Sequence, residues 1–175
     1  RVVEGGAVRV DGGRIVALGT DAEVPREPGD EIVDAGGRVV CPGLVNLHDH
    51  LYSTFATGMA VGPASDFVGV LEALWWRLDR SLTLEDVGAS ALPPLTRAIR
   101  KGFTTIFDHH ASPSAVEGSL DVLDHACTRV GLRAVLCYEV SDRDGPTVRD
   151  AGISENLRFL RAANARADGV RAGMM

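Results

Sequence analysis

The feature that most restricts the fold is an alternation of strand-like and helix-like segments that begins at residue 43. Short apolar runs rich in β-branched and aromatic residues are expected to form strands at residues 43–48, 103–107 and 132–140. A longer segment with helical start signals or helical spacing follows each of them. Three successive strand-then-helix units predict a parallel sheet with right-handed connections, and therefore an α/β fold.

The first helical segment begins at Thr83, which can cap the helix because Asp86 stands three residues later, as in a capping box. Gly102 is the expected stop at its C-terminal end. Pro93 and Pro94 lie in between, and a proline inside a helix removes a backbone donor and crowds the preceding turn. We therefore expect two helical pieces that meet just before the prolines.

The next two helices have start signals or spacing of their own. Ser114 and Glu117 form a second capping box, and this helix is expected to end near Gly131. In the third helical segment, apolar residues recur on one face, which predicts a helix from near Ser154 to just before Asp168.

The first forty residues have a different pattern, in which short apolar runs are separated by glycine turns. Residues 7–10 and 14–18 flank Asp-Gly-Gly, a sequence typical of a tight hairpin. Residues 31–34 and 38–41 flank Ala-Gly-Gly and predict a second hairpin. We expect the N-terminal segment to form a small antiparallel β unit.

The resulting domain prediction is a β unit at residues 1–41 followed by the strand–helix units at residues 42–175. Those units could belong to an open doubly wound sheet or to a barrel. The first strand is followed by histidines and not by G-x-G-x-x-G, which argues against a dinucleotide-binding sheet. A (β/α)8 barrel needs about 200 residues or more, and roughly 130 remain. We predict a partial TIM barrel, its first three strand–helix units, in a chain that is a fragment.

His48 and His50 stand at the end of the first predicted strand. Residues i and i+2 of a strand point to the same face, so both imidazoles are expected on one face and Asp49 on the other. (β/α)8 enzymes hold their catalytic groups at this end of the strands. A chelating pair of imidazoles here predicts a divalent metal site. Asn46 shares their parity, and it could steady a ligand or fill the core.

Three further residues are candidates for substrate contact. His109 and His110 end the second predicted strand, and only one of two adjacent residues can face the barrel interior. Their spacing does not decide which one does. Arg143 lies in the polar loop after the third strand, where it could meet an anionic substrate group or be solvated or ion-paired. His125 falls inside a helical segment and is interpreted as structural.

Charge and composition restrict the partners. The net charge is −6, and the 18 Lys and Arg residues are spread along the chain, which argues against nucleic acid. The sequence has neither an apolar run long enough to span a membrane nor a secretory signal, so the cytoplasm is the expected location. Cys41, Cys127 and Cys137 lie in or beside apolar runs without a C-x-x-C pair, and we expect all three to be reduced and buried.

The string CPGLVNLHDH at residues 41–50 resembles the P-G-hydrophobic-x-x-x-H-x-H signature of the amidohydrolase superfamily, in its deaminase and chlorohydrolase branch. Further strings are similar to the SsnA group of aminohydrolases. These are HLYS at 50–53, LWWRLD at 74–79, TTIFDHHASP at 104–113 and CYEVSDR at 137–143. The resemblance extends over almost the whole chain.

The resemblance implies a (β/α)8 barrel beside a β-sandwich built from both ends of a full-length chain, with residues 1–41 as its N-terminal share. It implies one divalent metal ion, zinc or iron, held by His48, His50, a histidine from strand five and an aspartate from strand eight. The acid–base residues, a glutamate and a histidine on strands five and six, would lie beyond this sequence. No catalytic residue is therefore expected within the chain, and the fragment alone is expected to be inactive.

The implied function is a hydrolase acting on C–N bonds other than peptide bonds, through a metal-activated hydroxide that deaminates a cyclic amidine or an aminated heterocycle. Two alternatives stay open. One is a binuclear cyclic amidase of the dihydropyrimidinase kind, and the other is a scaffold that kept the fold and lost activity. The expected partners are a small-molecule substrate and, at full length, further copies of the same chain.

Overall fold

The computed structural model describes residues 2–166 and 169–174. Contacts within the chain divide it into two units, residues 1–42 and 43–175. The division falls one residue after the boundary expected from the sequence.

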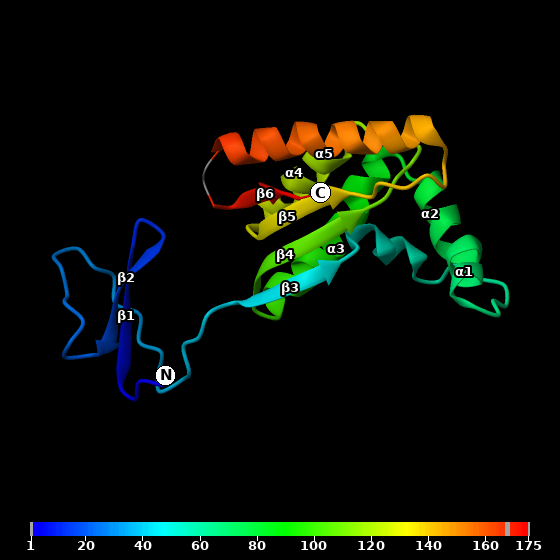
Figure 1. Ribbon diagram of the computed structural model, residues 1–175. Coiled ribbons are helices and arrows are strands. Elements are labelled where there is room, and N and C mark those ends of the chain that lie inside the picture. The colour runs from blue at the N-terminus through cyan, green and yellow to red at the C-terminus, as the bar shows by residue number, and fades with distance from the viewer. Residues whose placement is uncertain (1, 167–168, 175) are drawn as a thin grey trace. The chain divides into compact units, whose positions relative to one another are not determined.

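The N-terminal unit contains one antiparallel hairpin, formed by β1 (Gly6–Asp11) and β2 (Arg14–Thr20) (Figure 1). Gly12 and Gly13 form the turn with φ angles of 55° and 75°. Glycine adopts this left-handed conformation without the steric cost that a Cβ brings, which explains why Asp-Gly-Gly predicted the hairpin.

The prediction of a second hairpin at residues 31–34 and 38–41 is wrong. The chain turns at Gly36, but no strand forms between residues 21 and 43. The side chains of Ile32, Val33, Val39 and Val40 are all exposed. An isolated hairpin is marginal in water unless an apolar face packs against another layer, and none covers these residues within their own unit.

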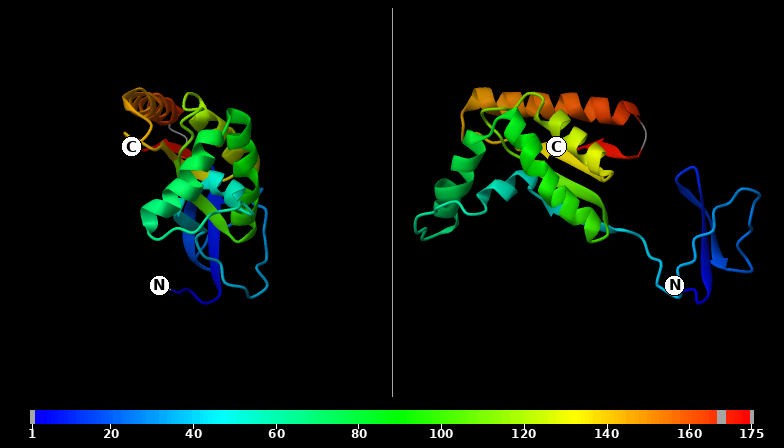
Figure 2. Two further views of the ribbon diagram at one scale, coloured as in Figure 1. Left: turned by 90° about the vertical axis from the view of Figure 1, so that its right-hand side faces the viewer. Right: turned by 180° about the vertical axis from the view of Figure 1, so that it is seen from behind.

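The C-terminal unit is built on a four-stranded parallel sheet in the order β3-β4-β5-β6. The strands are β3 (Leu44–Asp49), β4 (Phe103–His110), β5 (Arg133–Tyr138) and β6 (Arg171–Gly173). Successive strands are connected by helices α3 (Leu84–Arg100), α4 (Ser119–Val130) and α5 (Pro146–Arg166), which pack against the sheet, as Figures 1 and 2 show.

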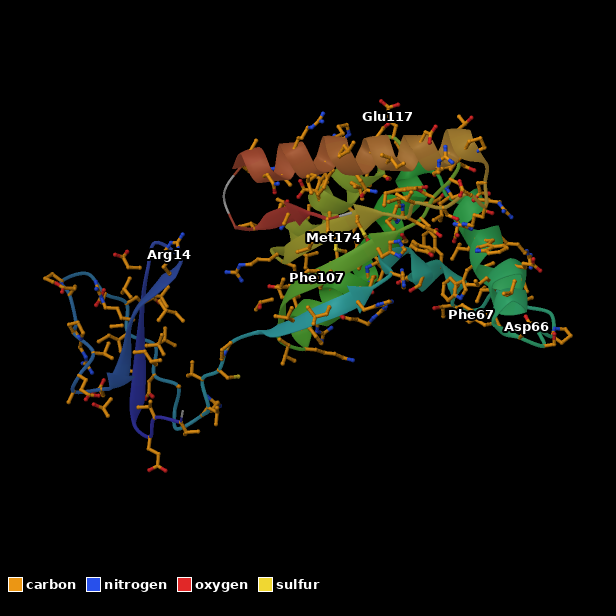
Figure 3. All side chains as sticks on the ribbon, in the orientation of Figure 1. Arg14, Asp66, Phe67, Phe107, Glu117 and Met174 are labelled. Atoms are coloured by element: carbon orange, nitrogen blue, oxygen red, sulfur yellow. The ribbon has the colours of Figure 1, made fainter. Side chains whose placement is uncertain are left out.

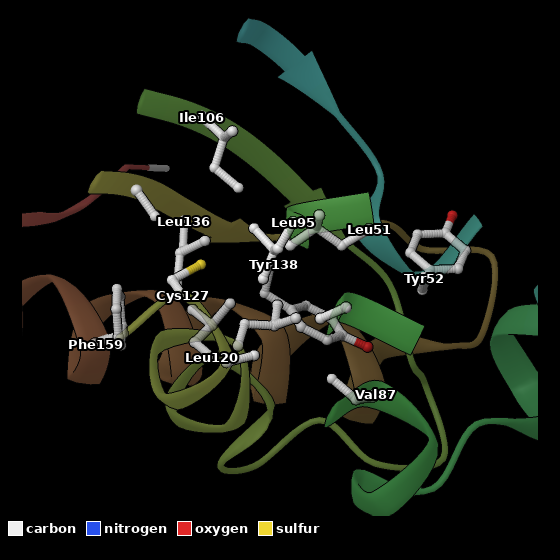
Figure 4. Close-up of a cluster of buried hydrophobic side chains, with 14 of the residues drawn as sticks. Leu51, Tyr52, Val87, Leu95, Ile106, Leu120, Cys127, Leu136, Tyr138 and Phe159 are labelled. Carbon is white, nitrogen blue, oxygen red and sulfur yellow. The ribbon is translucent and has the colours of Figure 1, made fainter. Parts of the chain in front are cut away.

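The two faces of the sheet differ in burial. Along β4, Ile106, Asp108 and His110 are fully buried, whereas Phe107 and His109 are only half-buried. Phe107 is marked in Figure 3. The buried face continues into a core between sheet and helices (Figure 4), which includes Leu51, Leu95, Ile106, Leu120, Leu123, Leu136 and Phe159.

The segment between β3 and α3 contains short helical pieces. These are a 3₁₀ turn at Leu51–Ala56, α1 (Phe67–Val70), a π-helical stretch at Leu71–Trp75 and α2 (Trp76–Ser81). Asp66, marked in Figure 3, caps α1 by accepting a hydrogen bond from Gly69 N at 2.7 Å. This segment places α2 near the carboxyl end of the sheet, where Arg80 contacts Asp144 in the loop after β5.

Helix α3 (Leu84–Arg100) confirms one prediction and corrects another. The capping box of Thr83 and Asp86 is formed in both directions. The expected break at Pro93 and Pro94 does not occur, because both prolines lie inside one continuous helix. Val87, Ala91 and Leu95 are fully buried along one side of the helix, and this packing outweighs the lost backbone hydrogen bonds.

Two predicted helix starts are displaced. Ser114 does not cap a helix, since its hydroxyl donates to Arg80 O, and α4 (Ser119–Val130) begins only after Gly118. Helix α5 (Pro146–Arg166) begins eight residues before the predicted Ser154. Proline at the first helical position needs no backbone donor there, a start signal that the apolar spacing alone did not reveal. The expected end at Asp168 lies outside the described residues.

The start of α4 is stabilised by a residue from α5. Gly118 offers no side chain for capping, and the buried Glu155 carboxylate accepts a hydrogen bond from Leu120 N at 3.2 Å. Arg158 pairs with the same carboxylate at 2.8 Å. The pKa of Glu155 is lowered despite its burial, because the hydrogen bonds from Arg158 and from the backbone at the helix start favour its charged form.

Replacing Glu155 with Gln is therefore expected to destabilise the protein by about 1–3 kcal/mol, the range for a buried hydrogen bond to a charged group. Glu117→Gln is the matched control, because Glu117 is exposed and forms no capping box. Urea unfolding at pH 7 measures both variants. Equal midpoints for the two variants would show that Glu155 does not stabilise this helix start.

All three cysteines are free thiols, and Cys127 and Cys137 are buried as expected. Cys41 is exposed, which corrects the prediction for that residue: it lies in the segment before β3 that forms no strand. Among the described helices, none has the length and apolar character needed to cross a membrane.

Candidate functional site

The rings of His48 and His50 converge at the carboxyl end of β3. Their Nε2 atoms lie 3.0 Å apart, and the ring planes are almost perpendicular. Two nitrogens at this separation, each at the usual Zn–N distance of about 2.1 Å, would subtend about 90° at a shared ion. A small opening of the pair reaches the tetrahedral angle, so the two imidazoles fit a divalent metal.

The tautomer of His50 follows from its second contact. His50 Nδ1 lies 2.8 Å from the backbone oxygen of His109, and a carbonyl oxygen can only accept. Nδ1 of the neutral ring therefore carries the proton, and Nε2 has a free lone pair that faces His48. A backbone carbonyl that holds Nδ1–H in this way is the usual support of a metal-binding histidine.

Strand β4 also fixes the residue that follows His50. Asp108, fully buried, accepts a hydrogen bond from Leu51 N at 2.8 Å through Oδ1. Its Oδ2 is buried and has no hydrogen-bond partner among the residues that the structure describes. Burial raises the pKa of Asp108 to about 8, and the nearby negative charge of Asp49 adds to the rise. At neutral pH, the metal-free site therefore holds Asp108 largely as a neutral acid.

Strict strand alternation does not describe the end of β3. The pairing register with β4 shifts between Asn46 and Asp49. Asn46 Nδ2 donates to Asp49 Oδ2 at 2.7 Å, and Asn46 Oδ1 accepts from His48 N at 3.2 Å. Asn46 thus braces the backbone of the histidine segment, and of the two roles that the sequence left open, steadying a ligand or filling the core, these contacts favour the first.

The structure distinguishes His109 from His110. The ring of His109 lies 5.5 Å from the ring of His50 and is half-buried on the same side as the histidine pair. His110 points to the helix side, where it is fully buried and contacts Ser112 Oγ at 2.9 Å. Burial lowers the pKa of His110 to about 3, so it is neutral at physiological pH.

Arg143 is held by three carboxylates, the most distant of which is Asp144, with its Oδ2 3.5 Å from Arg143 Nε. Arg143 Nη2 donates to Asp79 Oδ2 at 2.6 Å and to Glu139 Oε2 at 2.8 Å. Its guanidinium carbon lies 5.6 Å from the ring centroid of Trp76. Of the two readings left open by the sequence, the structure shows the ion-paired one.

Sequence reasoning missed three residues of this region, namely Asp79, Asp108 and Glu139. Asp108 lies near the end of β4, on the same face as His110, and Glu139 directly follows β5. Their positions at strand ends could therefore have indicated that both residues belong to the site. Asp79 had no local signal, because its partner Arg143 lies 64 residues away. Within the described residues, no group of three or more His, Cys, Asp or Glu side chains could hold a metal ion, so the pair of histidines stands alone.

Fold and site together define an α/β protein with paired imidazoles at the carboxyl end of a parallel sheet. Residues 39–174 match the sequence model of the amidohydrolase family, and the chain belongs to that family.

Curated relatives agree with this assignment. The 8-oxoguanine deaminase of Pseudomonas aeruginosa is 31% identical over 180 residues, which cover 95% of this chain and 39% of that protein. The 5'-deoxyadenosine deaminase of Methanosarcina barkeri is 32% identical over 171 residues, which cover 95% of this chain and 36% of that protein. The chain thus spans less than two fifths of the length of both relatives.

Solved structures show the same fold. An amidohydrolase from a Sargasso Sea environmental sample matches with a TM-score of 0.70 at 24% identity, covering 96% of this chain and 38% of that one. Atrazine chlorohydrolase TrzN from Arthrobacter aurescens TC1, complexed with zinc and atraton, matches with a TM-score of 0.68 at 20% identity. The match covers 95% of this chain and 40% of that one.

Proposed function

We propose that the complete protein is a metal-dependent hydrolase that deaminates an aminated heterocycle, with His48 and His50 as two ligands of one divalent ion. The observation that carries the proposal is the 3.0 Å approach of the two Nε2 atoms, with the His50 tautomer set by the His109 carbonyl. Zinc is the proposed metal and iron the alternative, since imidazole nitrogen suits both.

We further propose that the four-stranded sheet is part of a (β/α)8 barrel and that residues 1–41 belong to a β-sandwich. Family membership and the parallel strand order support the barrel. The remaining metal ligands and the acid–base residues would come from outside the described residues, as the family resemblance implies.

A bound divalent ion would lower the pKa of a coordinated water toward about 7 and so supply a nucleophile at neutral pH. The residues of this chain have separate roles. The His109 carbonyl keeps the His50 proton on Nδ1, and Asp108 holds the chain at Leu51 through its backbone. Both contacts fix the direction of His50 before a metal arrives.

Of the two adjacent histidines, we propose His109 as the substrate contact. It lies beside the histidine pair, whereas His110 is enclosed on the helix side. Burial lowers the pKa of His109, so its ring is neutral at pH 7 and can both donate and accept a hydrogen bond. A neutral ring also avoids repulsion between His109 and a metal cation.

The substrate class follows from the relatives, whose names describe the deamination of purine bases and nucleosides. They support a small aminated ring as the substrate of this protein. Three free thiols favour a reducing compartment, so the cytoplasm remains the proposed location, and a homo-oligomer the proposed assembly.

The test combines a metal analysis of the complete purified protein with ammonia release from guanine, 8-oxoguanine, adenine, cytosine and 5'-deoxyadenosine. We expect one metal ion per subunit and ammonia from at least one ring. Two metal ions per subunit with opening of a cyclic amide would favour the cyclic amidase instead. A protein that retains no metal and releases no ammonia would be the inactive scaffold.

A further inference from the structure

Glu139 follows β5 on the side of the sheet that faces the histidine pair. The register pairs His109 with Cys137 and His110 with Tyr138, so side chains alternate in step on the two strands. Glu139 is two residues beyond Cys137, and its N–H donates to His110 O at 2.7 Å, which continues the ladder past the end of the strand. Its carboxylate is therefore expected on the face of Cys137 and His109.

The carboxylate of Glu139 is held through one of its two oxygens. Arg143 Nη2 binds Oε2 at 2.8 Å, and no hydrogen bond within the described part of the chain reaches Oε1. The side chain is 28% exposed, whereas Asp79, the other partner of Arg143, is 2% exposed. A buried carboxylate thus neutralises the arginine, and the more exposed one keeps an oxygen free.

The arginine has a fixed position of its own. Asp79 belongs to α2, and Trp76 from the same helix lies against the guanidinium. Arg143 therefore connects the segment after β3 to the loop after β5. Because Asp79 and Trp76 hold the guanidinium in place, Arg143 can fix the orientation of the Glu139 carboxylate. A planar guanidinium that also pairs with Asp79 and Asp144 keeps its position when Glu139 binds a ligand.

We propose that Glu139 is a substrate-binding residue that accepts hydrogen bonds from N–H donors on the edge of the substrate ring, and that Arg143 is the positioning residue that orients it. The inference rests on the proposed deaminase function and specifies its substrate class. The ring would carry an N–H or a second amino group away from the amine that leaves. Once substrate covers this half-buried carboxylate, a ring that lacks the donor would leave Oε1 without a hydrogen bond, so the site is expected to discriminate against such rings.

The test uses the complete, metal-loaded protein and the substrate that the wild type deaminates fastest among guanine, 8-oxoguanine, adenine, cytosine and 5'-deoxyadenosine. Glu139→Gln keeps the size of the side chain and removes the charge. We expect kcat/KM to fall about 10- to 100-fold, the effect of one hydrogen bond to a charged group, mostly through KM. Metal content should be unchanged. Asp142→Asn is the matched control, since that neighbouring carboxylate is 79% exposed and pairs with Arg149.

Arg143→Met and Arg143→Lys test the positioning role. We expect Met to raise KM nearly as much as Glu139→Gln does, and Lys to recover part of the loss because it keeps the positive charge. A role in folding alone would lower the active fraction, and hence kcat, with KM unchanged; that result overturns the positioning role.

The two levels of the proposal fail in different ways. An active wild type with an unchanged KM in Glu139→Gln overturns the binding role and leaves the deaminase function intact. A metal-loaded wild type that releases no ammonia from any of these rings overturns the proposed function and this inference with it.

Discussion

Replacing His48 with Ala in the complete protein is expected to remove most of the bound metal and to lower kcat/KM by about 10³-fold or more. The physical reason is that His48 and His50 are proposed to chelate the ion together, and their Nε2 atoms already lie 3.0 Å apart. Removing one imidazole leaves a single nitrogen, and the metal-dependent nucleophile is lost with the metal. His50→Ala is expected to have the same effect.

The control for this experiment is His125→Ala, because His125 is an exposed histidine on α4. It removes an imidazole of the same chemistry without touching the site. Metal analysis by atomic absorption and the ammonia assay measure all three variants. Full metal content in His48→Ala would rule out the proposed role of the pair.

Replacing Asp108 with Asn is expected to abolish a large pH dependence of stability in the metal-free protein. The folded state holds the Asp108 proton until a pKa of about 8, whereas the ordinary pKa of an aspartate is 3.8. Between these values, the unfolded state binds fewer protons than the folded state, so stability falls as pH rises. Asn cannot lose a proton and can still accept from Leu51 N.

The expected size of this effect is on the order of 3 kcal/mol between pH 5 and pH 8, at about 1.4 kcal/mol per pH unit. Below about pH 3.8 the variant and the wild type should be about equally stable. At pH 5 the variant should already be more stable by about 1–2 kcal/mol, and the difference should grow toward pH 8. The low pKa of His110 acts equally in both proteins and cancels in the difference.

Denaturant unfolding in the presence of a chelator, at several pH values from 5 to 8, measures the difference. Asp142→Asn serves as the control, since Asp142 is exposed and its replacement should leave the curve parallel to the wild type. Parallel curves for Asp108→Asn as well would show that Asp108 is ionised in the folded protein.

The elements that the sequence predicted well are those with a strong local signal. Apolar runs bounded by glycines marked the strands, and Thr83 with Asp86 marked the start of α3. The errors occurred where local signals conflicted with packing. Pro93 and Pro94 argued for a break, but the buried side of α3 keeps the helix whole. Ser114 and Glu117 had the right spacing for a cap, yet the α4 start is stabilised by Glu155 from another helix.

For the site, the sequence by itself predicted that the rings of His48 and His50 lie together, because two residues that are two positions apart at the end of a strand are close in space in any fold. The orientation of His109 and His110, the tautomer of His50 and the partners of Arg143 depend on atoms from strands and helices up to 64 residues apart. Only the tertiary structure decided these features. Burial and hydrogen-bond partners depend on which elements pack together in the fold. A local sequence pattern does not predict this packing.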